Sequence, residues 1–125
     1  MTTLGLIGYG AIAREIVSAF PPDAVDWVVL LREGASPELP TNVRAVTRLD
    51  LLIDARPEAV VEAAGQEAVA ACVPALLEAG IPTVVASVGA LASASLYARI
   101  IEAGRNGGAP FILPVIVAIL GLLMV

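Results

Sequence analysis

LGLIGYGAIA, at residues 4–13, places a glycine-rich turn between a short apolar run and a helix-forming run. Gly8 permits a tight turn from strand to helix, and Gly10 removes the Cβ that would block a pyrophosphate. Ala13 lets the helix pack closely on the strand. The free N–H groups of the first helical turn and the positive end of the helix dipole would then face the anion. The stretch predicts a dinucleotide-binding turn.

The length and the single cysteine indicate one domain from a reducing compartment. A chain of 125 residues can bury roughly two-thirds of its unfolded surface without disulfides. Cys72 cannot pair within the chain, and its alanine-rich helical surroundings favour a small core residue over a reactive thiol. The start of the sequence lacks the positively charged region of a secretory signal. We therefore expect a cytoplasmic protein.

The charged residues exclude several classes of function. The formal net charge is -5, and all seven basic residues are arginines, which argues against a nucleic-acid partner. Histidine and lysine are absent. Without histidine, the chain lacks the commonest general base near neutral pH and cannot form a histidine-based metal site. Without lysine, Schiff-base catalysis and the P-loop mechanism are excluded. Any proton transfer must therefore be done by another kind of group, and we expect no metal-binding residue in this chain.

The C-terminal residues 110–125 form an atypical apolar tail. Residues 111–125 are an uncharged run of 15, which is shorter than the roughly 20 residues that span a bilayer as a helix. No basic residue flanks the run, so a membrane partner is not expected. Apolar surface of this size favours burial against the sheet or a second copy, which predicts a homo-oligomer.

Apolar runs alternate with alanine-rich segments whose charges recur at helical spacing, a pattern typical of repeated β-α units. We predict an α/β fold, a three-layer Rossmann-like doubly wound and mostly parallel sheet of about six strands, in a single domain. Strands are expected at Thr3–Ile7, Trp27–Leu31, Val43–Val46, Ala59–Glu62, Thr83–Ser87 and from Phe111. Helices are expected at Ala11–Phe20, Leu49–Ala55, Glu67–Ala79 and from Ser93 to about Ala103, with a loop at Val88–Ala92 and a kink or split at Pro74.

Three loops of small residues follow predicted strands. They are Gly8–Ala11, Ala63–Gln66 and Ser87–Leu91. Sheets of this kind bind ligands outside the carboxyl ends of their strands, where the winding direction reverses. Small residues at strand ends also serve plain packing, but the joint placement favours one ligand site to which all three loops contribute.

The residues of these loops resemble the L-aspartate dehydrogenase family. The matching motifs are GYGAIA at 8–13, VVEAAGQ at 60–66 and VASVGAL at 85–91, in the family's order and spacing. The resemblance covers about Thr3 to Pro114. It implies the N-terminal Rossmann domain of an enzyme that oxidises L-aspartate to iminoaspartate with NAD or NADP.

The same resemblance implies that this chain is incomplete as an enzyme. In the family, a histidine from a later α+β domain serves at the active centre, and that domain supplies most contacts to the substrate. This region is absent from the 125 residues. No catalytic residue is carried over, L-aspartate is expected to bind only with the second domain, and the isolated chain is expected to be inactive. The tail also departs from the family, because bulky residues at 115–120 replace glycines expected near the nicotinamide ribose.

The candidate ligand of this chain is a nicotinamide dinucleotide. Its cofactor-binding residues are predicted to be Gly8, Gly10, Ala11, Ile12, Arg32, Ala64, Gly65, Gln66, Ser87, Val88 and Gly89. Arg32 follows the second strand, where an arginine accepts a 2′-phosphate, which favours NADP or dual use. A solvated strand-end charge is the alternative.

Gln66 and three further residues have individual interpretations. An amide such as that of Gln66 can bond the nicotinamide or its ribose. Glu62 is interpreted as a hydrogen-bonded turn carboxylate, Tyr9 as a cover for the phosphate turn, and Trp27 as core or edge packing.

A second hypothesis belongs to a different class. The apolar tail is consistent with a non-catalytic structural or oligomerisation module in which it buries against the sheet or a second copy. A third hypothesis is that the tail anchors the chain to a membrane or is an altered terminus. The first two hypotheses are compatible, because a cofactor domain can also associate.

Overall fold

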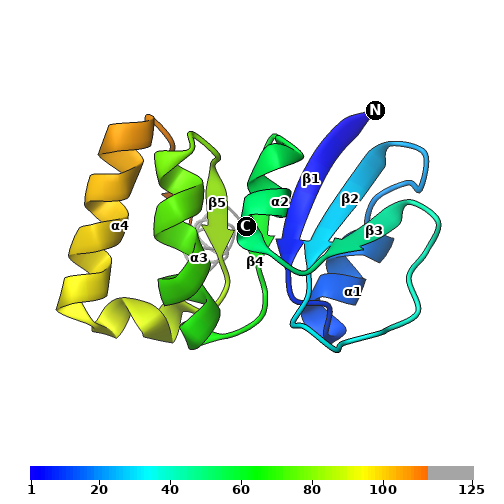
Figure 1. Ribbon diagram of the computed structural model, residues 1–125, viewed down its shortest axis with the longest axis horizontal. Coiled ribbons are helices and arrows are strands. Elements are labelled where there is room, and N and C mark those ends of the chain that lie inside the picture. Colours follow the sequence, from blue (N-terminus) through cyan, green and yellow to red (C-terminus); the bar gives the residue numbers. More distant parts are fainter. Residues whose placement is uncertain (113–125) are drawn as a thin grey trace, which may run out of the picture.

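Each predicted apolar run forms a strand, and the structure, a computed structural model, describes residues 1–112 (Figure 1). The strands are β1 (Thr2–Ile7), β2 (Val25–Leu30), β3 (Val43–Val46), β4 (Val60–Glu62), β5 (Thr83–Val85) and β6 (Phe111–Ile112). Between them lie α1 (Ala11–Ser18), α2 (Leu49–Asp54), α3 (Gln66–Glu78), the 3₁₀ helix η1 (Val88–Ala92) and α4 (Ala94–Gly107). None of the helices within residues 1–112 is both long and apolar enough to cross a membrane. The predictions made for the tail lie outside the described residues.

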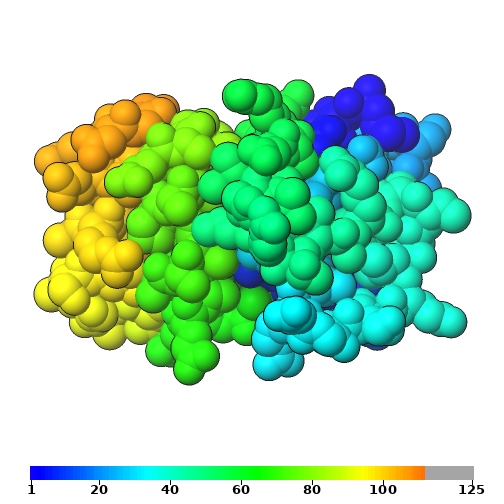
Figure 2. All heavy atoms as spheres, in the orientation of Figure 1, coloured from blue at the N-terminus to red at the C-terminus, as the bar shows by residue number. Residues whose placement is uncertain are grey.

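The six strands form one parallel sheet in the order β3-β2-β1-β4-β5-β6. The chain winds outward from β1 to β3, returns to the middle at β4 and then winds the other way. Leu6 of β1 therefore lies between Val29 of β2 and Val61 of β4. In Figure 2, the atoms of the first half of the chain (blue to cyan) lie directly against those of the second half (green to orange). This order confirms the predicted doubly wound fold, in which the reversal between β1 and β4 marks the ligand-binding edge.

Side chains that alternate along the strands give the sheet two buried faces. Leu6 and Trp27 pack with Val17 of α1 on one face. The next residue in β1, Ile7, packs with Leu52 of α2 on the other face, together with side chains of α3. Because helices cover both faces, the strands read as apolar runs rather than as alternating ones. The result is the predicted three-layer arrangement.

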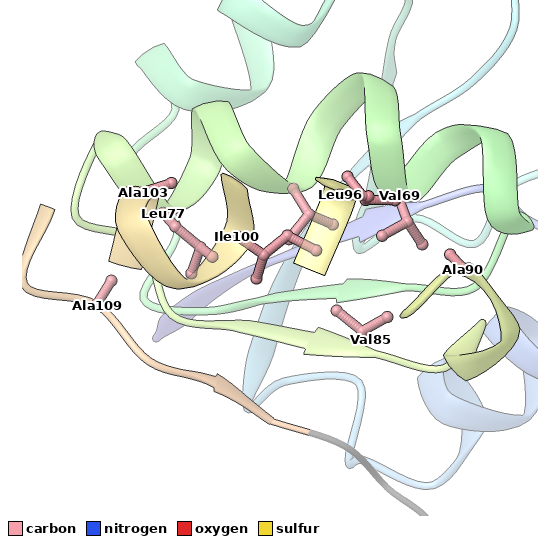
Figure 3. Packing of buried hydrophobic residues seen from close by; sticks show 9 residues of the cluster. Val69, Leu77, Val85, Ala90, Leu96, Ile100, Ala103 and Ala109 are labelled. Carbon is pink, nitrogen blue, oxygen red and sulfur yellow. The ribbon is translucent and has the colours of Figure 1, made fainter. Parts of the chain in front are cut away.

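A separate part of the core holds the second half of the chain together. Val69 and Leu77 of α3, Val85 of β5 and Ile100 of α4 point toward one another, as Figure 3 shows, and belong to one buried cluster. The helices α3 and α4 lie side by side at the end of the sheet away from β3 (Figure 1). This packing holds the end of β5 and the loop after it in place.

Helix ends follow the capping residues in the sequence. The hydroxyl of Ser93 accepts a hydrogen bond from the N–H of Leu96 at 3.3 Å, which confirms Ser93 as the N-cap of α4. Gly108 ends α4 in the left-handed conformation. The predicted loop at 88–92 is wrong in detail, because these five residues form the short helix η1. β5 is also shorter than predicted and ends at Val85.

Of the two effects predicted for Pro74, a kink or a split of α3, the split is not found. The helix runs unbroken from Gln66 to Glu78 with Pro74 inside it. A proline at this place removes one helical hydrogen bond, but Val73 and Leu76 on either side of it are fully buried. Val73 packs with side chains of α4 and Leu76 packs with the sheet and α2, and this burial outweighs the local cost of the proline.

The close approach of α4 to α3 depends on the absence of a side chain at Gly107. A Cβ at this position would overlap the carbonyl oxygen of Leu77 and lie 2.8 Å from its carbonyl carbon. Both are backbone atoms, so the helices would have to separate. We expect Gly107→Ala to lower the free energy of unfolding by at least about 2 kcal/mol, measured by urea unfolding with Trp27 fluorescence as the signal.

Gly108→Ala is the matched control for this prediction. Gly108 has φ +67°, but a Cβ there meets no atom within 4 Å. Only the left-handed backbone is penalised, at about 1 kcal/mol. Equal losses of stability in the two variants would contradict the steric argument.

Candidate functional site

The glycine-rich turn connects β1 to α1 and contacts the loop after β4. Gly8 has φ +85°, a conformation that favours glycine, and its N–H donates to the carbonyl oxygen of Leu30 at 3.0 Å. A Cβ on Gly8 would lie 2.8 Å from the Cβ of Ala64. Gly8 thus serves the tight turn, as predicted, and also the close packing of two loops on either side of the winding reversal.

The N-terminus of α1 is open toward the carboxyl edge of the sheet. Gly10 is its N-cap, no side chain caps it, and its first turn holds no acidic residue. The first N–H groups of a helix have no partners within the helix and attract anions. A Cβ on Gly10 would meet no protein atom within 4 Å. Space and hydrogen-bond donors therefore coincide at this turn.

Glu62, the last residue of β4, joins the loop after β4 to the loop after β5. It is fully buried. Its Oε2 accepts the N–H groups of Ala64 and Gly65 at 2.8 Å each and the hydroxyl of Ser87 at 2.9 Å. Its Oε1 accepts the N–H of Ser87 at 2.9 Å. The turn carboxylate inferred from the sequence is found, but its reach to Ser87, 25 residues away, was not predicted.

The bonds to Glu62 determine which backbone donors remain free for a ligand. The N–H groups of Ala64, Gly65 and Ser87 are already engaged. The N-terminus of α3 next to them carries Glu67 in its first turn, which disfavours an anion there. Among these loops, the turn that leads into α1 is the one suited to a pyrophosphate.

The predicted site residues lie along this edge, and most are exposed. Gln66 reaches the third loop, since a Cβ on Gly89 would collide with its Nε2. Ile12 and Val88 are large apolar side chains with 60% and 38% of their surface exposed. Arg32 lies two residues beyond the end of β2 and is exposed. The structure brings the three predicted loops together through the contacts of Gly8, Glu62 and Gln66.

A cavity that the sequence did not predict lies beside the glycine-rich turn. It is an open cavity of about 880 Å³ between α1 and residues 38–42, lined by Tyr9, Arg14 and Phe20 among others. The guanidinium of Arg14 lies 5.5 Å from the centre of the Tyr9 ring. Tyr9 thus packs beside α1, and its suggested role as a cover for the phosphate turn stays a prediction. The residues that line this cavity form no motif in the sequence from which it could have been predicted.

Two residues that the sequence placed in the core are found there. Trp27 is fully buried, and its ring meets that of Phe20 edge to face at a centroid distance of 5.5 Å. Cys72 is buried, and burial, with a smaller contribution from the negative charge of Glu62, raises the pKa of its thiol. A raised pKa disfavours the reactive thiolate. Within residues 1–112 no three side chains of His, Cys, Asp or Glu gather into a metal site.

Comparison with known proteins assigns the chain to a protein family. Residues 8–114 match the homoserine dehydrogenase NAD-binding domain family. L-aspartate dehydrogenase 2 of Bordetella bronchiseptica is 39% identical over 116 residues, covering 89% of this chain and 43% of that protein. L-aspartate dehydrogenase of Cupriavidus taiwanensis is 37% identical over 117 residues, covering 86% and 43%. The chain therefore spans less than half the length of these relatives.

Solved structures support the fold independently of sequence. The aspartate dehydrogenase of Thermotoga maritima superposes with a TM-score of 0.73 at 21% identity, covering 90% of this chain and 45% of that one. The motifs at 8–13, 60–66 and 85–91 all lie within the matched family region. The chain thus belongs to the homoserine dehydrogenase NAD-binding domain family, as an NAD-binding domain of the kind found in L-aspartate dehydrogenase-like oxidoreductases.

Proposed function

We propose that this chain binds NAD or NADP across the carboxyl edge of its sheet and serves as the cofactor domain of an enzyme that oxidises L-aspartate to iminoaspartate. The observation that carries the proposal is the uncapped N-terminus of α1, with open space in front of Gly10. The pyrophosphate would accept hydrogen bonds from the first-turn N–H groups of Ala11 and Ile12. The family membership of residues 8–114 supports the same ligand.

The two ends of the dinucleotide would lie over different halves of the sheet. In doubly wound folds, a residue just beyond the second strand reads the adenosine ribose, and here the exposed Arg32 lies two residues beyond β2. The nicotinamide half then falls to the loops after β4 and β5, where Gln66 offers its amide. When bound, the nicotinamide ring accepts a hydride from the substrate. The chain itself would hold and orient the cofactor.

We further propose that the substrate L-aspartate is bound with residues outside this sequence. The relatives of which the chain matches 43% are named L-aspartate dehydrogenases. The exposed apolar side chains of Ile12 and Val88 at the binding edge are suited to contact the ligand or a second domain. A cytoplasmic location for this domain of residues 1–125 remains part of the proposal, supported by the single buried cysteine.

A second candidate function, as an oligomerisation module, is favoured by the outer face of α4. Tyr97 has 45% of its surface exposed and stacks edge to face on Phe111 at the end of the sheet. Together with Ile101 it lines an open hollow of about 580 Å³. Exposed tyrosines are common at protein interfaces, and a homo-oligomer formed through this face is compatible with cofactor binding at the carboxyl edge.

The first prediction concerns cofactor binding. The wild-type chain should bind NADH and NADPH saturably, seen as quenching of the Trp27 fluorescence and by calorimetry. Gly10→Ala should raise both dissociation constants at least roughly tenfold, because its methyl group fills the space for the pyrophosphate. Its backbone, at φ -89°, suits alanine, so we expect a stability loss below about 1 kcal/mol.

Gly108→Ala, which loses similar stability at the far end of α4, is the control and should bind both nucleotides like the wild type. Absence of saturable wild-type binding at millimolar nucleotide would contradict the proposed function. Unchanged binding by Gly10→Ala would contradict the assigned position of the pyrophosphate.

The second prediction concerns the choice between NADP and NAD. If Arg32 pairs with the 2′-phosphate, Arg32→Gln should weaken NADPH binding roughly tenfold and change NADH binding less than about twofold. Arg44→Gln, an exposed arginine on β3, is the control and should change neither. Equal effects of Arg32→Gln on both nucleotides, measured by calorimetry, would show that Arg32 does not read the 2′-phosphate.

The third prediction concerns activity. The purified 125-residue chain should produce no NADH or NADPH when L-aspartate and the oxidised cofactor are added, because it holds no histidine or lysine to take up a proton. Absorbance at the nicotinamide band measures this directly. Aspartate-dependent turnover above a boiled control would overturn the proposal that the substrate needs residues outside this sequence.

A further inference from the structure

We propose that Glu62 is a positioning residue for the nicotinamide half of the cofactor, and this inference rests on the proposed function. Its carboxylate ties the loop after β4 to the loop after β5, so that both present one rigid surface to the ligand. Four donors from three residues, Ala64, Gly65 and Ser87, meet this one side chain. A side chain that served only its own turn would not need the two bonds to Ser87.

The burial of Glu62 makes this tie difficult to break. The side chain is fully buried. Within residues 1–112, the salt bridge is formed by Arg48 and Asp50 on the surface, and Glu62 takes no part in one. Its contacts are therefore N–H and O–H donors rather than a positive charge. Because a buried charge is stable only when it is hydrogen-bonded or paired, the two loops cannot move apart without stripping donors from the carboxylate.

Other contacts between these two loops are weaker. The N–H of Ala86 donates to the backbone oxygen of Glu62 at 3.1 Å, which continues the β4–β5 ladder. Gln66 and Gly89 touch through the exposed amide of Gln66. The ladder bond orients β5 but does not constrain the residues after it. The packing of η1 on α3 holds the later part of this loop, and Glu62 adds the side-chain hydrogen bonds at Ser87, where the chain leaves the sheet.

The position of Glu62 in the fold assigns it to one half of the ligand. A doubly wound sheet consists of two mononucleotide-binding halves, and β4 opens the second half. The first half holds the glycine-rich turn and Arg32, which would take the pyrophosphate and adenosine. The contact of Gly8 with Ala64 connects the halves, but no hydrogen bond of Glu62 reaches the first half. Loss of the tie should therefore weaken binding of the nicotinamide end selectively.

Glu62→Gln tests this with a small change. The amide oxygen can still accept from Ala64, Gly65 and the hydroxyl of Ser87, but the amide NH₂ then faces the N–H of Ser87, donor against donor. The substitution thus breaks the backbone bond of Ser87 to residue 62, which weakens the tie between the loops, and it keeps the turn after β4. We expect the dissociation constant of NADH to rise roughly tenfold or more. That of ADP, which lacks the nicotinamide riboside, should change less than about twofold.

The control is Glu58→Gln, the same chemical change at an exposed residue before β4, at the opposite edge of the sheet. It should leave the affinities for both ligands unchanged. Ser87→Ala is the second test variant: it removes the hydroxyl bond to Glu62 but keeps the backbone bond, so its effect on NADH should be selective and smaller. Calorimetry gives the affinities, and circular dichroism shows that each variant is folded.

A folded Glu62→Gln variant that binds NADH like the wild type, or that loses NADH and ADP equally, overturns the inference. If this variant does not fold, Ser87→Ala decides: a selective loss of NADH supports the inference, and an equal or absent loss overturns it. A wild-type chain that binds neither ligand overturns the proposed function and the inference with it. A wild-type chain that binds both, with no selective effect in the variants, overturns only the inference.

Discussion

The binding edge of this domain depends on one buried carboxylate that is satisfied by hydrogen bonds alone. Glu62 ends β4 inside the protein, where an unpaired charge would be costly. Its oxygens accept the backbone N–H groups of Ala64 and Gly65 and both donors of Ser87. Two loops that are far apart in the sequence are thereby held at fixed positions. The backbone donors that would otherwise attract an anion at the second loop are used internally.

This arrangement makes the two helix N-termini at the edge different from each other. The turn before α1 keeps its donors free, has no acidic residue and has open space at Gly10. The turn before α3 has given two donors to Glu62 and carries Glu67. Both helices begin after a glycine, so the residue type alone does not separate them. The difference lies in where the carboxylate of β4 points.

The sequence predicts the local structure and the meeting of the three loops well, because both depend on short-range patterns. β3 has the predicted bounds, and the loops around Gly8, Ala64 and Ser87 meet at the carboxyl edge as expected. The bond from Glu62 to Ser87 spans 25 residues and has no short-range signal beyond one charged residue in an apolar strand. Pro74 does not split α3, because tertiary packing of Val73 and Leu76 overrides this local effect.

The same geometry explains why the carboxylate at the site is unsuited to acid-base chemistry. A general base needs a free lone pair within reach of the substrate proton, whereas the oxygens of Glu62 are buried and accept from three residues. A domain that organises its binding edge around this residue must leave proton transfer to other groups. In the proposed function, Glu62 contributes by fixing the loops that hold and orient the cofactor rather than by transferring protons.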